Sequence, residues 1–300
     1  MKKILFKGCG TAIATPFTED GVNFKEFSKL IEFQIEQGVD SIIVCGTTGE
    51  SSTMTDEERK ATIKFVVDTV NGRIPVIAGT GSNNTKHAIE LSKYAESIGV
   101  DGVLLVTPYY NKTTQSGLIA HYTAIAKEIH IPIILYNVPS RTGVNILPAT
   151  ALELSKIDNI VAIKEASGNI SQVAEIARIC GDNLSIYSGN DDQIIPILSL
   201  GGIGVISVLS NIAPKYTHDI VYNYVNGKNK LALDMQLNAI ELINSLFCEV
   251  NPAPVKAALN MVGYHFGKPR LPLVEISSAN ANILKNNLEA FKKSERKFDD

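Results

Sequence analysis

The chain has 300 residues, and its 28 basic and 31 acidic side chains leave a formal net charge of −3 at pH 7. This balance gives no electrostatic basis for binding nucleic acid or an anionic membrane, and 45% hydrophobic with 20% charged residues is typical of a soluble globular protein. No apolar run approaches membrane-spanning length and the four cysteines form no Cys-x-x-Cys pair, so we expect a cytoplasmic protein with reduced thiols.

Eight short apolar runs predict eight buried strands. In chain order they lie near residues 11–15, 41–45, 75–79, 102–106, 132–136, 160–164, 184–187 and 203–207. The segment 38–44 recurs as 99–105 and the segment 74–78 as 131–135, about 60 residues later in each case. A recurrence over two strand-and-helix units puts one unit at about 30 residues.

Helical patterns fill the gaps between the strands. The second helix opens with a capping box of Thr55 and Glu58, and the third ends at Gly99. Eight such units without a long linker predict a closed (β/α)8 TIM barrel over residues 1–210. Further helical segments predict a C-terminal helical appendage over residues 211–300. They are 213–225, 231–246, 253–262 and 282–291.

Lys164 is the most informative side chain. It ends the apolar run of the sixth strand, which is typical of a strand buried on both faces of a parallel sheet. Removal from water disfavours an ammonium, and a neutral amine can attack a carbonyl carbon to form a Schiff base. The alternative is a lysine that caps the strand and extends its amine into solvent.

Other strand ends carry matching chemistry, because active sites of this fold are built where the strands end. A Schiff base needs a proton donor and acceptor beside the amine. Tyr136, which ends the fifth strand, can serve with Thr47 and Tyr110 as a proton relay. Each has a simpler interpretation, since the turn with Thr47 resembles many βα loops and Tyr110 could pack at a rim or a subunit contact.

Two further features favour anions. The Gly-Thr-Thr-Gly turn at 46–49 offers backbone N–H groups and hydroxyls to a small carboxylate. Arg141 offers a second, fork-shaped anion site, unless it only forms a surface ion pair. Two anion sites around one amine indicate two keto-acid or aldehyde-acid substrates.

Four segments together resemble the dihydrodipicolinate synthases (4-hydroxy-tetrahydrodipicolinate synthases), from one end of the chain to the other. They are Gly-Thr-Thr-Gly-Glu at 46–50, Thr-Pro-Tyr-Tyr-Asn at 107–111, Leu-Tyr-Asn-Val-Pro-Ser-Arg-Thr-Gly at 135–143 and Ile-Lys-Glu-Ala-Ser-Gly at 163–168. The first and last are shared across the class I pyruvate aldolase and lyase superfamily. The third discriminates, since sialic acid lyases generally lack an arginine where Arg141 stands.

The resemblance implies a role for each of these residues. Lys164 would form the Schiff base with pyruvate, and Tyr136 would be the general acid/base in a relay with Thr47 and Tyr110. The substrate-binding residues would be Thr48 for the pyruvate carboxylate, backbone groups near Gly189 and Ile206 for the pyruvate pocket, and Arg141 for the carboxylate of aspartate β-semialdehyde.

The implied product is 4-hydroxy-tetrahydrodipicolinate, which commits carbon to diaminopimelate and lysine. No metal or organic cofactor is expected, because the lysine itself is the electron sink. In the family the tyrosine matching Tyr110 reaches into a neighbouring subunit. The resemblance therefore implies a catalytic dimer and a homotetramer made of two dimers.

Lysine-inhibited members of the family bind lysine at the dimer cleft. The matching positions here are Ser51, Asp56, Arg59, Asn83, His87 and Tyr109. His87 stands where those members often have a glutamate, whose carboxylate would balance the ammonium of lysine. Because loss of a buried partner for a cation weakens binding, we expect weak or absent feedback inhibition.

Two other functions compete with the synthase. A pyruvate-releasing aldolase or lyase of a sugar acid would use the same lysine, but a polyol chain has no need of Arg141. A non-catalytic barrel that only binds a keto acid should lack a complete relay, and here Thr47, Tyr110, Tyr136 and Lys164 are all present.

Overall fold

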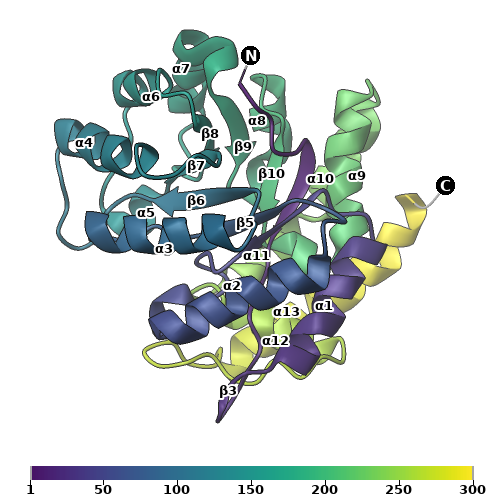
Figure 1. Ribbon diagram of the computed structural model, residues 1–300. Coiled ribbons are helices and arrows are strands. Elements are labelled where there is room, and N and C mark those ends of the chain that lie inside the picture. Colours follow the sequence, from purple (N-terminus) through teal and green to yellow (C-terminus); the bar gives the residue numbers. More distant parts are fainter. Residues whose placement is uncertain (1, 299–300) are drawn as a thin grey trace.

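The computed structural model describes residues 2–298 and shows a closed barrel of eight parallel strands (Figure 1). The strands follow one another around the barrel in the order β1-β10-β9-β8-β7-β6-β5-β4. Their bounds are β1 Gly8–Ala12, β4 Ser41–Val44, β5 Val76–Gly79, β6 Gly102–Val106, β7 Ile133–Asn137, β8 Ile160–Glu165, β9 Ser185–Ser188 and β10 Gly204–Ser207. The predicted TIM barrel is confirmed.

The first strand lies three residues earlier than predicted. It includes Gly8 and Gly10, whose missing side chains weaken the strand pattern. Both glycines are required by close neighbours. A Cβ on Gly8 would lie 2.1 Å from the carboxylate of Asp40, and a Cβ on Gly10 would lie 2.7 Å from the ring of Phe6. Packing overrides the weak local strand propensity.

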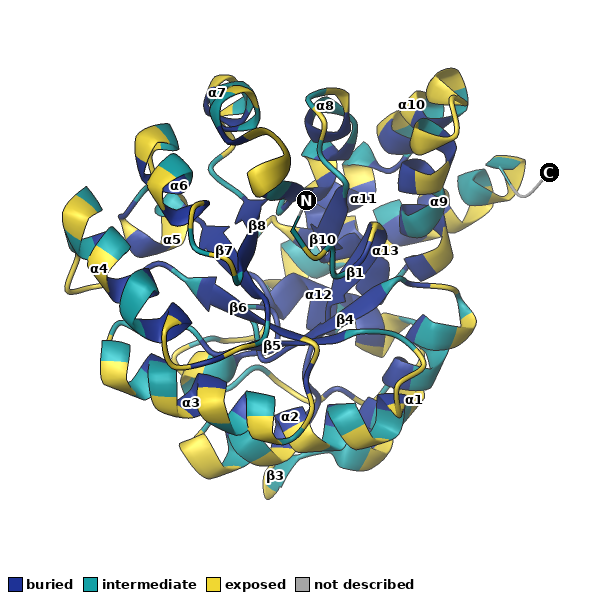
Figure 2. Cartoon of the chain, turned by 45° about the horizontal axis from the view of Figure 1, so that its top comes forward, coloured by how far each residue is buried: buried dark blue, intermediate teal, exposed yellow. Residues whose placement is uncertain are grey.

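Helices surround the barrel, with buried inner faces and exposed outer faces (Figure 2). They are α1 Phe24–Glu36, α2 Asp56–Val70, α3 Thr85–Ser97, α4 Gln115–Ala126, α5 Pro139–Thr142, α6 Pro148–Leu154, α7 Ile170–Cys180, α8 Ile194–Ser199 and α9 Pro214–Val225. The predicted capping box begins α2: Thr55 accepts from the Glu58 amide, and the Glu58 carboxylate accepts from the Thr55 amide.

The last part of the described chain is helical, as predicted, with α10 Asn229–Asn238, α11 Ile240–Leu246, α12 Ala253–Met261 and α13 Ser278–Ser294. The predicted helix 231–246 is in fact two helices, because α10 ends at Asn238 and α11 begins at Ile240, with Ala239 as the capping residue between them. Short 3-10 turns and one small hairpin, β2 Phe17–Thr18 with β3 Gly21–Val22, complete the fold.

The division of the chain at residue 210 stays a prediction, and Met1, Asp299 and Asp300 at its two ends lie outside the described residues. Between residues 2 and 298, no helix combines the length and the apolar character that crossing a membrane requires.

The inside of the barrel is filled with side chains rather than open. At the end where the strands begin, the Phe6 ring stacks on Tyr187 at 4.4 Å between centroids, and the Tyr187 hydroxyl donates to the Phe6 carbonyl at 2.7 Å. Ile43, Ile77 and Ile134 belong to the same interior cluster. Packed interiors of this kind leave the opposite end, where the strands finish, as the place for a site.

Candidate active site

Lys164 and Tyr136 lie side by side near the ends of β8 and β7. The two residues are partners in the parallel register of these strands, and their exposed fractions are 5% and 7%. The Lys164 amine lies 4.3 Å from the centroid of the Tyr136 ring. Within residues 2–298 this amine forms no direct ion pair, although the buried Asp191 carboxylate is close enough to interact with it electrostatically.

Gly189 leaves room for the lysine side chain. It follows β9, and its amide donates to the Glu165 carbonyl at 2.8 Å. A Cβ here would lie 2.7 Å from the Ala166 Cβ and 3.0 Å from the Lys164 Cε. Ile206, in β10, is fully buried in the same interior cluster as Tyr136. Gly189 thus lies against the Lys164 side chain, and Ile206 is part of the barrel interior that includes Tyr136.

The Gly-Thr-Thr-Gly turn follows β4 and is tightly folded. The amides of Gly49 and Glu50 donate back to the carbonyls of Gly46 and Thr47, each at 3.1 Å. Thr48 is 3% exposed, whereas Thr47 is half-buried. The turn is followed by a 3-10 turn and then α2, so it is not itself the first turn of a long helix.

The C-terminal helices hold this turn from behind. The side-chain amide of Asn251 donates to the Thr48 hydroxyl at 3.0 Å. Its side-chain oxygen is buried without a hydrogen-bond partner in the described chain. The Lys256 amine lies 2.7 Å from the Glu50 carboxylate, and both side chains are at most 1% exposed. The Arg270 amide donates to the same carboxylate at 2.9 Å.

Sequence reasoning missed Asn251 and Lys256, which lie more than 200 residues from their partners. Neither stands at the end of a predicted strand. No local pattern of spacing signals such contacts, and the only hint is Glu50, an acidic residue in an otherwise uncharged turn.

Arg141 and Tyr110 are exposed at the rim. Arg141 is on the short helix α5, and the structure gives its guanidinium no hydrogen bond or ion pair to residues 2–298. Tyr110 is 92% exposed and has a backbone φ of 67°, a left-handed conformation that is uncommon for a tyrosine. Its side chain therefore does not join Tyr136 within its own chain.

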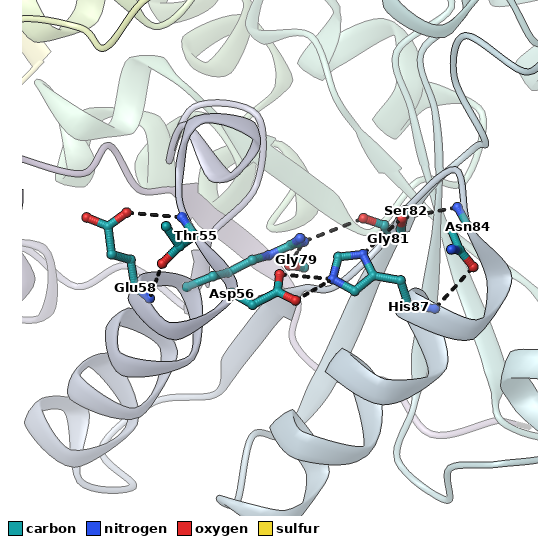
Figure 3. Close-up of polar contacts among 9 residues, drawn as sticks. Thr55, Asp56, Glu58, Gly79, Gly81, Ser82, Asn84 and His87 are labelled. Atoms are coloured by element: carbon teal, nitrogen blue, oxygen red, sulfur yellow. Dashed lines mark hydrogen bonds and ion pairs between the residues drawn. The ribbon is translucent and has the colours of Figure 1, made fainter.

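Two of the candidate regulatory residues, Asp56 of α2 and His87 of α3, point toward each other (Figure 3). The His87 Nε2 lies 2.9 Å from the Asp56 carboxylate, and its Nδ1 lies 3.2 Å from the Ser82 hydroxyl. Asn83 accepts at its carbonyl from the Asn111 side chain at 3.0 Å. Ser51 is half-buried and Tyr109 is 37% exposed.

Arg59, from α2, is the buried cation among the candidate regulatory residues. Its guanidinium donates to the Gly79 carbonyl at 2.5 Å and the Gly81 carbonyl at 3.5 Å, and its Nε has no partner in the described chain. Burial lowers the pKa of Arg59. This group of residues thus combines a buried arginine with an Asp56 carboxylate that already contacts His87.

The chain matches the model of the Dihydrodipicolinate synthetase family over residues 5–291. The 4-hydroxy-tetrahydrodipicolinate synthase of Clostridium novyi (strain NT) is 60% identical over 292 residues, covering 97% of this chain and 99% of that protein. The enzyme of the same name from Clostridium tetani (strain Massachusetts / E88) is 61% identical over 285 residues, covering 95% and 97%.

Solved structures agree with these relatives. The 4-hydroxy-tetrahydrodipicolinate synthase of Methylacidiphilum fumariolicum SolV superposes with a TM-score of 0.96 at 42% identity, covering 99% of this chain and 98% of that one. The dihydrodipicolinate synthase of Thermotoga maritima gives 0.94 at 42% identity, covering 96% and 99%.

Proposed function

Because the chain belongs to the dihydrodipicolinate synthetase family, we propose how its own residues carry out the reaction of that family. The reaction is the condensation of pyruvate with L-aspartate 4-semialdehyde to 4-hydroxy-tetrahydrodipicolinate, the first committed step towards diaminopimelate and lysine. The enzyme is a lyase of the class I aldolase type. The contact of the Lys164 amine with the Tyr136 ring carries the assignment of residues.

The first half-reaction forms an enamine on Lys164. The amine attacks the keto carbon of pyruvate, and the carbinolamine loses water to give an imine. Tyr136 donates and accepts the protons of these steps. Loss of a methyl proton then converts the imine to the enamine. Thr48 and the amides of its turn hold the pyruvate carboxylate, and Asn251 fixes the direction of the Thr48 hydroxyl.

The second half-reaction forms the new carbon–carbon bond. The enamine carbon adds to the aldehyde, and Arg141 receives the carboxylate of the semialdehyde. The amino group of the semialdehyde then attacks the imine carbon. The ring closes as the Lys164 amine leaves, so the enzyme regains its free lysine and no external electron donor or acceptor is needed.

The relay is completed by a second copy of the chain in this proposal. Tyr110 is 92% exposed on its own chain and held in a left-handed conformation, which supports a contact with a partner subunit. Thr47 would link the partner's tyrosine to Tyr136. A dimer is then the catalytic unit, and a homotetramer of two dimers is the assembly that we propose.

Feedback control by lysine is weak or absent in this proposal. The Asp56 carboxylate, which could bind a lysine ammonium, is paired with His87, and Arg59 adds a buried positive charge. A lysine ammonium would therefore lie near the buried Arg59 cation, without a free carboxylate partner at Asp56. Inhibition of initial rates by lysine at low micromolar concentration would contradict it.

A coupled assay tests the proposed chemistry. The protein is given pyruvate with aspartate semialdehyde, and in a parallel reaction N-acetylneuraminate alone. We expect turnover of the first pair and no cleavage of the second. Borohydride with pyruvate should add one pyruvyl group per chain, on the peptide that contains Lys164. Labelling elsewhere, or cleavage of the sugar acid at a comparable rate, would overturn the assignment.

A further inference from the structure

A buried polar cluster lies directly behind the two central residues of the site. Asn137 follows Tyr136 at the end of β7, and Glu165 follows Lys164 at the end of β8. Successive side chains of a strand point to opposite faces. Tyr136 belongs to the barrel interior, so Asn137 and Glu165 point outward, where they meet Gln172 of α7.

Glu165 is a buried carboxylate whose donors are all neutral amides in the described chain. The Asn137 side-chain amide donates to its two oxygens at 3.2 Å and 3.0 Å. The Ser167 backbone amide donates at 2.7 Å and the Gln172 side chain at 3.3 Å. Asn137 and Glu165 are 0% and 1% exposed, and a buried carboxylate is costly without such donors.

The same cluster fastens the segment that carries Arg141. The side-chain carbonyl of Asn137 accepts from the Ile146 amide at 2.9 Å, and its amide donates to Asn145 at 2.8 Å. Asn145 donates in turn to Gln172 at 2.7 Å. One pair of side chains thus contacts two catalytic strands, the helix behind them and the loop at the rim.

The pairing of β7 with β8 is irregular at its other end. Ile133 pairs with Ile160 but Ile134 pairs with Ala162, so β8 contains one extra residue there. A bulge locally disrupts the ladder of hydrogen bonds, so the register at this end is held less firmly. A shift of β8 by one residue would turn Lys164 away from the barrel interior while Tyr136 stayed in place.

We propose that Glu165 and Asn137 are positioning residues for the reaction. Their hydrogen bonds fix the catalytic ends of β7 and β8 in one register, and this directs the Lys164 amine and the Tyr136 hydroxyl toward the same bound pyruvate. This inference rests on the proposed function, since it concerns how well that chemistry runs.

An exchange of donor and acceptor tests the proposal. Glu165→Gln places one amide against another and should lower kcat about 100-fold, as expected for a reacting group displaced by about 1 Å. Asn137→Asp should have a similar effect. In the double variant a carboxylate at 137 again faces an amide at 165, and kcat should recover at least about tenfold over either single variant.

Thr11→Val is the matched control. It removes another buried hydrogen bond from a barrel strand to a helix, between the Thr11 hydroxyl and Gln34 at 2.7 Å. The control should lower Tm while leaving kcat within about twofold. If Glu165→Gln keeps a normal kcat well below its Tm, or if the control loses kcat equally, the positioning role is overturned.

Two further measurements keep the outcomes separate. If the wild-type protein shows no borohydride-trapped pyruvyl group on Lys164, the proposed function fails. If the wild type labels and Glu165→Gln labels and turns over at the same rate, only the positioning role fails. Should Glu165→Gln not fold, Gln172→Met removes one donor at the edge of the cluster, and a several-fold lower kcat supports the proposal whereas an unchanged kcat overturns it.

Discussion

Two lysines of this protein are buried to nearly the same degree but in different company. Lys164 is 5% exposed and Lys256 is 1% exposed, and their amines lie 4.3 Å and 4.4 Å from the centroids of Tyr136 and Phe17. The Lys256 amine has two further partners. It lies 2.7 Å from the Glu50 carboxylate and donates to the Lys268 carbonyl at 3.2 Å.

The difference shows that burial alone does not make an amine a nucleophile. Burial lowers the pKa of Lys256, and the Glu50 carboxylate opposes that effect because it favours the ammonium. The Lys256–Glu50 pair ties α12 to the turn that we propose binds pyruvate. Lys164 has no ion-pair partner between residues 2 and 298 and meets a phenol instead.

The largest effect is expected when each lysine is replaced, in a separate variant, by an uncharged residue. Lys164→Ala should lose the borohydride-trapped pyruvyl group and lower kcat by about 10⁴-fold or more, because the nucleophile is removed. Lys256→Met should still be labelled once, at Lys164, when folded. Mass spectrometry of the labelled peptides distinguishes the two. Labelling of Lys256 in the wild type or in Lys164→Ala would break the comparison.

Stability should respond in the opposite way. Lys256→Met leaves the Glu50 carboxylate buried without its cation, which should cost about 3–5 kcal/mol of unfolding free energy. Replacing both partners by apolar residues should cost less than the single change. Denaturant unfolding of the single and double variants measures this. A single variant within about 1 kcal/mol of the wild type would show that the pair contributes little.

Crowding of the Lys164 side chain should lower kcat less than its removal does. Gly189→Ala introduces a methyl group 3.0 Å from the Lys164 Cε and should displace that side chain. We expect kcat to fall about 100-fold. The unfolding free energy should also fall, by about 1–3 kcal/mol, because the methyl group would lie 2.7 Å from the Ala166 Cβ. Steady-state kinetics and denaturant unfolding measure the two effects. The comparison is made with the wild type, because no open glycine gives a matched control. An alanine at Gly38 or Gly201 would have a positive φ, and Gly46 lies in the turn proposed to bind pyruvate.

Two arginines extend the comparison to the rim. Arg270 forms two hydrogen bonds to Glu58 at 2.7 Å and 2.8 Å, whereas Arg141 has no such partner in the described chain. Arg141→Ala should raise the KM for the semialdehyde about 10- to 100-fold, the loss expected for a charged hydrogen bond, and leave the KM for pyruvate nearly unchanged. Steady-state kinetics with each substrate varied in turn measures both KM values. Equal increases in the two would remove Arg141 from the second-substrate site.

A half-buried ion pair should give the smallest effect. The His218 Nδ1 lies 2.8 Å from the Asp40 carboxylate, and this hydrogen bond raises the pKa of His218. The pair therefore stabilises the fold fully below the ordinary pKa of histidine, about 6.5, and loses this contribution as pH rises through the raised value. His218→Asn should lower stability by about 0.5–1 kcal/mol at about pH 6 and less at about pH 9. Thermal unfolding at both pH values checks the sign.

The barrel and the rim residues could be predicted because they depend on local pattern. Apolar strands that alternate with amphipathic helices predict the fold, and residues that end those strands predict the convergence of Lys164 and Tyr136. The prediction placed the first strand three residues too late, because only contacts with side chains distant in the sequence explain Gly8 and Gly10. The Asn251–Thr48 contact and the Lys256–Glu50 pair were not predictable, since long-range contacts leave no periodic signal.

The stack of Phe6 on Tyr187 has a kinetic consequence. The two rings fill part of the barrel interior, so on our proposal both substrates and the cyclic product share the mouth at the ends of the strands. A pyruvate attached to Lys164 would lie innermost, and the aldehyde would arrive after it. We therefore expect ordered binding, with the keto acid first and the cyclic product released before the next cycle begins.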